Sequence, residues 1–111
     1  MKPVIAISLG DPAGISPEVV AKSLDDALSR CIPVVFGHRP TLERVLKQLS
    51  SGVPIDFVEP AAAPLVLHPD RVVAVHCGPD DGPIDRPDDR AAAAQFAALE
   101  QAVDSVLQGP C

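Results

Sequence analysis

The sequence has 111 residues, a hydrophobic fraction of 47% and a formal net charge of −6, which fits one acidic globular domain spanning residues 1–111. Its nine Lys and Arg residues are scattered and do not form the basic face that nucleic-acid binding requires. The apolar runs are far shorter than the ~20 residues needed to span a membrane, and the N-terminal run is too short for a signal-peptide core. We therefore expect a cytoplasmic protein that binds neither nucleic acid nor membrane.

Short β-prone runs alternate with amphipathic segments along the chain. In chain order, we expect a strand over 3–9, a helix over 16–30, a strand over 32–36, a helix over 40–49, strands over 54–58 and 72–77, and a helix from 87 or 88 to 107. This alternation predicts the α/β class, with a mostly parallel sheet, flanking helices and right-handed crossovers.

Local signals mark the start of the first helix and the apolar face of the last. Ser16 is expected to cap the first helix, Pro17 suits the first helical position, and Glu18 complements the positive end of the helix dipole. In the last helix the larger apolar residues recur at helical spacing and predict its apolar face: Ala92, Phe96, Leu99, Val103 and Val106.

The segment most informative about function is residues 10–18, with the sequence GDPAGISPE. It joins the carboxyl end of the first strand, where open α/β sheets bind ligands, to a helix N-terminus, whose free N–H groups attract anions. Two glycines permit close backbone approach, and Asp11 supplies a charge that could orient a polar group. A plain strand–turn–helix joint remains the alternative. The segment is neither GxGxxG nor a Walker phosphate loop, so a Rossmann dinucleotide fold is not supported.

These nine residues resemble the N-terminal signature GDPAGIGPE of the 4-hydroxythreonine-4-phosphate dehydrogenase family, with Ser16 at a position where the pattern has glycine. They are also similar to the GDGIGPE segment of isocitrate and isopropylmalate dehydrogenases, whose fold that family shares. Residues 34–37 resemble the second strand of the family and its glycine stop. The resemblance implies a partial isocitrate/isopropylmalate dehydrogenase-like domain, forming the N-terminal part of a longer dehydrogenase.

The resemblance further implies an enzyme that oxidises 4-phosphohydroxy-threonine with NAD or NADP in pyridoxal phosphate (vitamin B6) biosynthesis. Relatives act on phosphorylated threonates. Family members are homodimers and use a divalent metal (Zn, Mg or Co) held by histidines. Carried onto this chain, the family pattern gives six cofactor-binding residues: Gly10, Asp11, Ala13, Gly14, Ile15 and Ser16.

The family's metal ligands and most of its substrate-phosphate contacts lie beyond the matched region. We therefore expect no catalytic residue and no metal ligand in this chain, and no activity of the chain alone. The alternatives are a non-catalytic nucleotide-binding or interaction module and a remnant without function.

The remaining polar residues match no compact metal motif. His76 is expected to be structural or partly buried, whereas His38 and His68 are expected to be solvated. Cys31 and Cys77 are expected to be buried free thiols. A run of acidic residues lacks the order of a calcium loop and is interpreted as a solvated loop leading into a helix start: Asp80, Asp81, Asp85, Asp88 and Asp89.

Overall fold

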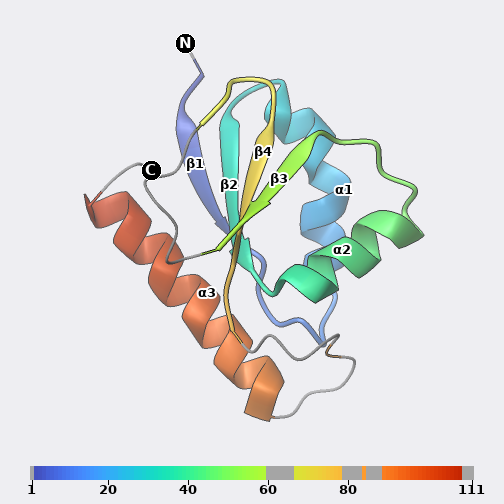
Figure 1. The fold of residues 1–111 in the computed structure, drawn as a ribbon, viewed down its shortest axis with the longest axis vertical. Coiled ribbons are helices and arrows are strands. Elements are labelled where there is room, and N and C mark those ends of the chain that lie inside the picture. Colours follow the sequence, from blue (N-terminus) through green and yellow to red (C-terminus); the bar gives the residue numbers. More distant parts are fainter. Residues whose placement is uncertain (1, 60–66, 79–83, 85–88, 109–111) are drawn as a thin grey trace.

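The computed structural model describes residues 2–59, 67–78, 84 and 89–108. Within these residues, four parallel strands form one sheet in the order β1-β2-β4-β3 (Figure 1). The strands are β1 (Val4–Ser8), β2 (Ile32–Gly37), β3 (Ile55–Val58) and β4 (Val72–His76). The helices are α1 (Ser16–Leu28), α2 (Arg39–Gln48) and α3 (Asp89–Gln108). The predicted α/β class, element order and parallel pairing are confirmed.

The helices cover both faces of the sheet (Figure 1). Helices α1 and α2 pack against each other and on one face, while α3 packs on the opposite face against β1 and β2. In the described part of the chain, no helix combines the length and apolar character that crossing a membrane requires.

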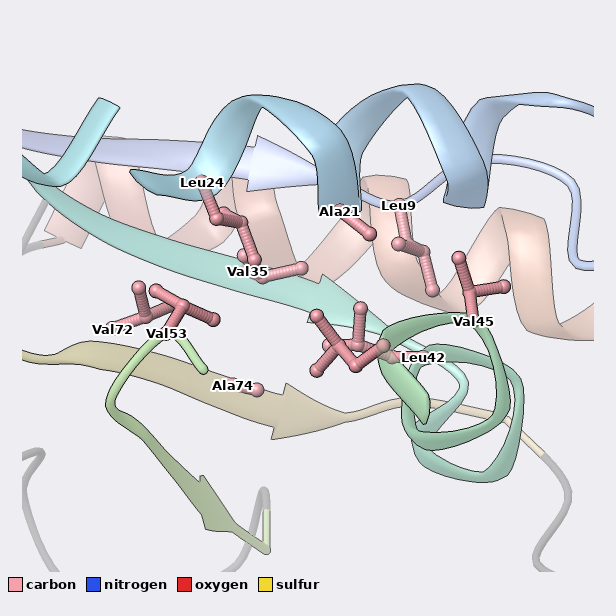
Figure 2. Close-up of a cluster of buried hydrophobic side chains, with 10 residues drawn as sticks. Leu9, Ala21, Leu24, Val35, Leu42, Val45, Val53, Val72 and Ala74 are labelled. Atoms are coloured by element: carbon pink, nitrogen blue, oxygen red, sulfur yellow. The ribbon is translucent and has the colours of Figure 1, made fainter. Parts of the chain in front are cut away.

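The two faces of the central strands supply two separate cores because side chains alternate along a strand. In β2, Val35 points toward α1 and α2, whereas Val34 and Phe36 belong to the core under α3. Figure 2 shows side chains of the first core meeting between the sheet, α1 and α2: Leu9, Ala21, Leu24, Val35, Leu42, Val45, Val53, Val72 and Ala74. The strands that lie in the middle of the sheet are therefore apolar on both faces, which explains their continuous Val-rich runs.

Helix α3 buries a different face from the one the sequence predicted. Its small residues are the buried ones: Ala98 and Ala102 pack on the sheet, and Ala91 and Ala94 pack against Ile84. The larger apolar residues of the predicted face are exposed, including Phe96 at 66%. The physical reason is close approach: a Cβ placed on Gly78 would stand 2.7 Å from the Ala94 Cα. A helix lying this near the backbone after β4 has room only for methyl side chains in between.

The start of α1 also differs from the prediction. Ser16 is the first helical residue, Ile15 occupies the N-cap position, and no side-chain hydrogen bond caps the helix. The helix ends at Leu28, two positions before the predicted end at Arg30. The cap prediction failed because the turn before the helix holds Ile15 in a right-handed conformation, with φ of −90° and ψ of −13°, which carries Ser16 past the cap position.

Candidate functional site

The segment 10–15 lies at the edge of the sheet where all the strands end. Since the strands are parallel, the carboxyl ends of β1, β2, β4 and β3 share this edge. Leu9, just after β1, is fully buried and donates its backbone N–H to the Phe36 carbonyl over 2.8 Å. Gly10 then turns the chain out of the sheet with φ of +83°. The candidate loop therefore begins from a rigidly held point beside the end of β2.

Asp11 organises the loop through its own backbone and side chain. Its Oδ1 atom accepts the Ala13 N–H at 2.9 Å, and its carbonyl accepts the Gly14 N–H at 3.0 Å. Asp11 thus accepts both hydrogen bonds that hold the turn, a common role of aspartate in loops. The Ala13 side chain is partly buried against a small cluster formed by Ile84, Ala91 and Ala94, which ties the loop to the first turns of α3.

The backbone requires glycine at one of the two glycine positions of the loop but not at the other. At Gly10 the positive φ favours glycine, and an added Cβ would stand 2.9 Å from the Ser16 Cβ. At Gly14 the nearest atoms to an added Cβ are those of Asp11 at 3.5 Å, which is ordinary van der Waals contact. The fold therefore accounts for glycine at position 10. It does not account for glycine at position 14, which lies on the exposed side of the loop.

The loop leads directly into the N-terminus of α1. The N–H groups of Ser16 and Glu18 belong to the first helical turn, where backbone N–H groups have no intrahelical acceptor, and Pro17 has no N–H. Ile15 is 77% exposed, and Ser16 is exposed beside it. Glu18 adds a negative charge, which is paired with Lys22 at 3.2 Å. The arrangement offers backbone donors and a helix dipole to an anionic group.

Two buried histidines lie at the same edge of the sheet. His38, only 1% exposed, places its Nδ1 atom 2.7 Å from the Thr41 hydroxyl. His76 Nδ1 accepts the Arg39 backbone N–H at 3.0 Å, and the two imidazole centroids are 5.7 Å apart. The predicted burial of His76 is confirmed. The predicted solvation of His38 is wrong, because its side chain is enclosed between Thr41 and the His76 ring.

The predictions for His68 and Cys77 are confirmed. His68 is exposed, as predicted. Cys77 is a buried free thiol, and burial raises its pKa to about 12. Cys31 is also a free thiol but only partly buried, so the prediction of full burial is wrong for it. It lies just after α1 and one residue before β2, where part of its side chain remains in contact with solvent.

Sequence comparison finds relatives across almost the whole chain, although no protein-family model matches it. A 4-hydroxythreonine-4-phosphate dehydrogenase from a Synechococcus strain is 36% identical over 110 residues, covering 97% of this chain and 31% of the relative. The same enzyme from a second Synechococcus strain is 34% identical and covers 96% of this chain. This chain belongs to the 4-hydroxythreonine-4-phosphate dehydrogenase family. It spans about a third of the length of the relatives it matches.

Solved structures carry the same family description. The crystal structure of a 4-hydroxythreonine-4-phosphate dehydrogenase from Burkholderia phymatum superimposes with a TM-score of 0.75 at 28% identity, covering 96% of this chain and 33% of that one. The enzyme from Klebsiella pneumoniae superimposes with a TM-score of 0.66 at 29% identity, over 97% of this chain and 34% of that one. The resemblance seen in residues 10–18 thus extends to the entire described fold.

The divalent metal implied by this dehydrogenase family does not fit the described part of the chain. Within residues 2–59, 67–78, 84 and 89–108, no three His, Cys, Asp or Glu side chains converge on a position that could hold a metal ion. Of the acidic run noted in the sequence, Asp89 lies in the first turn of α3, and the four others fall outside the described residues.

Proposed function

We propose that this chain forms the cofactor side of an NAD- or NADP-dependent dehydrogenase that oxidises 4-phosphohydroxy-threonine in pyridoxal phosphate biosynthesis. Its dinucleotide contact consists of Gly10, Asp11, Ala13, Gly14, Ile15 and Ser16. The observation that carries the proposal is Gly14: it stands exposed at the carboxyl edge of a parallel sheet, beside a helix N-terminus, where the fold itself does not require glycine.

The chemistry of the loop suits the phosphate part of a dinucleotide. The backbone N–H groups of Ser16 and Glu18 donate toward the anionic phosphate oxygens, aided by the dipole of α1. Gly14 leaves space for the ligand to approach the backbone, and the Asp11 carboxylate keeps the turn in shape through Ala13. When bound, the nicotinamide accepts the hydride that the substrate alcohol carbon loses.

The complete reaction is proposed to need more polypeptide than this chain supplies. The relatives are about three times as long, and the described residues bring no three metal-ligating side chains together. Substrate-phosphate contacts, metal ligands and the homodimer interface are proposed to come from the remaining length of a full-size cytoplasmic dehydrogenase. The isolated chain is then expected to bind the dinucleotide without turning over substrate.

Calorimetric titration with NAD and NADP tests the loop. Asp11→Asn keeps an acceptor for the Ala13 N–H but removes the charge, Asp11→Ala removes both, and Asp25→Ala changes an exposed carboxylate on α1 away from the loop. We expect binding by the parent chain and Asp25→Ala, and the largest loss with Asp11→Ala. Equal affinity for all four proteins, or no binding at millimolar dinucleotide, contradicts the proposal.

A turnover assay tests the second part of the proposal. The purified chain is mixed with 4-phosphohydroxy-threonine, NAD or NADP and each of Zn²⁺, Mg²⁺ and Co²⁺, and absorbance of the reduced nicotinamide is followed. We expect no reduction above the blank, while a full-length family member reacts under the same conditions. Turnover by the isolated chain would overturn the claim that the remaining polypeptide is required.

A further inference from the structure

A trough of about 500 Å³ lies between α2 and β3, at the opposite end of the sheet from the candidate loop. Its volume is within the range of sites that bind small molecules. Helix α2 forms one wall, and β3 with the segment before it forms the other. The residues that decide what it binds are Leu46, Lys47, Ser50, Val53, Ile55 and Phe57. None of them belongs to the proposed dinucleotide contact, so a ligand here would occupy a second site.

The surface of the trough is apolar along β3. Leu46 and Val53 are buried in the core between the sheet, α1 and α2. Ile55 and Phe57 pack against that core and remain only partly buried. The Arg39 guanidinium lies over the Phe57 ring, with 4.7 Å between Cζ and the ring centroid, and this contact steadies the ring. An apolar group placed in the trough would remove exposed surface of Ile55 and Phe57 from water, which favours binding.

Two polar groups without a protein partner lie at the end of the trough where the chain enters β3. Within the described part of the chain, Lys47 forms no ion pair and the Ser50 hydroxyl forms no hydrogen bond. The other described lysines are engaged, because Lys2 donates to backbone carbonyls and Lys22 is in an ion pair. The last carbonyls of α2 accept the backbone N–H groups of residues 49–51 and therefore do not compete for the ammonium. This end offers an ammonium and a hydroxyl to a carboxylate.

The backbone at Ser50 favours glycine rather than serine. Ser50 follows the C-cap residue of α2 and has a φ of +52°, in the left-handed region. Glycine is the usual residue at this position, because a residue with a Cβ is strained there. The Ser50 backbone N–H already closes the helix end by donating to the Lys47 carbonyl, so the hydroxyl adds nothing to that closure. A serine at such a position therefore indicates a function for its hydroxyl.

The charge around the trough favours an anion. Helix α2 carries three positive side chains and one negative one, in a chain whose net charge is −6. We propose that the trough binds a small organic carboxylate with an apolar body, of the size of a medium-chain fatty acid. Its carboxylate lies between Lys47 and Ser50, and its apolar body lies on Ile55 and Phe57. A peptide strand is disfavoured, because β3 is an edge strand of only four residues and short edge strands resist strand addition.

Titration with octanoate, followed by backbone amide NMR, tests this site, with octanol as a neutral analogue of the same length. We expect saturable shifts at Ser51, Ile55 and Phe57, and binding of octanol that is weaker by about tenfold. Lys47→Glu is expected to weaken octanoate binding by about tenfold or more. Arg30→Glu makes the same charge change at an exposed arginine that does not line the trough, and it should leave the affinity unchanged.

Ser50→Gly separates contact with the ligand from a purely structural role. The substitution relieves the left-handed backbone, so we expect a higher melting temperature. It also removes the hydroxyl, so octanoate should bind roughly fivefold more weakly, the usual effect of losing one hydrogen bond. A structural role alone would raise the melting temperature and leave the affinity as it was.

Four outcomes would overturn the inference. The first is no saturable binding of octanoate at millimolar concentration, or equal binding of octanoate and octanol. The second is unchanged affinity in Lys47→Glu or in Ser50→Gly. The third is a set of shifts centred on the exposed apolar residues of α3, such as Leu99 and Val103. The fourth is a peptide with a free C-terminal carboxylate that binds in the trough more tightly than octanoate by about tenfold. None of these readouts depends on NAD, so this site and the dinucleotide contact can fail independently.

Discussion

Gly37 lies so close beneath Leu9 that a methyl group at position 37 would stand 2.7 Å from the Leu9 Cδ2 atom. Leu9 immediately precedes Gly10, where the candidate loop starts, and Gly37 immediately precedes the buried His38. The contact therefore sets the end of β1 against the end of β2. It fixes where the loop leaves the sheet.

Gly37→Ala is predicted to destabilise the fold by about 1–3 kcal/mol, the usual cost of overpacking a filled core. Urea unfolding followed by circular dichroism measures it. Gly52→Ala is the matched control, because nothing lies within 4 Å of an added Cβ there, and its stability should be unchanged or slightly higher. Equal unfolding midpoints for the two variants would show that the contact with Leu9 is not tight.

The two loop glycines should separate stability from binding. Gly10→Ala is predicted to cost about 1–2 kcal/mol of stability, because a residue with a Cβ is strained at the φ of +83° found there. Gly14→Ala should leave unfolding unchanged and weaken NAD binding by about tenfold, or ~1.4 kcal/mol, because its methyl group occupies the ligand's approach. Unchanged affinity in Gly14→Ala would remove the main support for the cofactor loop.

The two described cysteines should differ in reactivity. Burial raises the pKa of Cys77 to about 12, so almost none of it is thiolate at pH 8, whereas Cys31 is partly exposed. Iodoacetamide at pH 8 is therefore predicted to alkylate Cys31 well before Cys77, as measured by peptide mass spectrometry. In urea both should react. Comparable rates in the folded protein would mean that β4 opens readily at its end.

The ion pair between Asp56 and Arg71 should give a pH-dependent contribution. Arg71 donates two hydrogen bonds to the Asp56 carboxylate, at 2.7 and 2.9 Å, and these hold the pKa of Asp56 below its usual value of 3.8. A lowered pKa means that the contribution is present above the unfolded-state value and is lost as pH falls through the folded-state value. The stability difference between the parent and Asp56→Asn should thus be small, constant near neutrality and absent in strong acid. It should also shrink in high salt, because the pair is exposed to solvent. A difference that persists unchanged at low pH would contradict this origin.

Sequence patterns were sufficient for the order and type of the elements because hydrophobic periodicity is a local property. The faces of α3 show a property that hydrophobic periodicity does not predict, namely which side of a helix is buried. Positions 91, 94, 98 and 102 and positions 92, 96, 99, 103 and 106 both have helical spacing, and hydrophobicity favours the second set. The fold buries the first set, because the backbone of Gly78 stands too near Ala94 for anything larger. The distance between two packed elements is set by the tertiary structure and cannot be predicted from local sequence patterns.

The candidate site was predictable in part. The loop motif was recognisable from residues 10–18, but the pairing order that brings β4 beside β2 was not, and this order places His76 next to His38. A local signal for His38 did exist: Thr41 lies three residues on, the spacing at which a side chain before a helix meets one in its first turn. For Ser16 the local signal was misleading: serine is a good capping residue, but the turn before the helix puts Ile15 in the N-cap position.

The most direct test of dinucleotide binding by the loop is a titration of the isotopically labelled chain with NAD, following backbone amide shifts by NMR. The largest saturable shifts are predicted at Gly10, Asp11, Gly14, Ile15 and Ser16, with little change in β3 or in the C-terminal half of α2. Shifts centred elsewhere, or none at millimolar NAD, would contradict the claim that this loop is a dinucleotide contact.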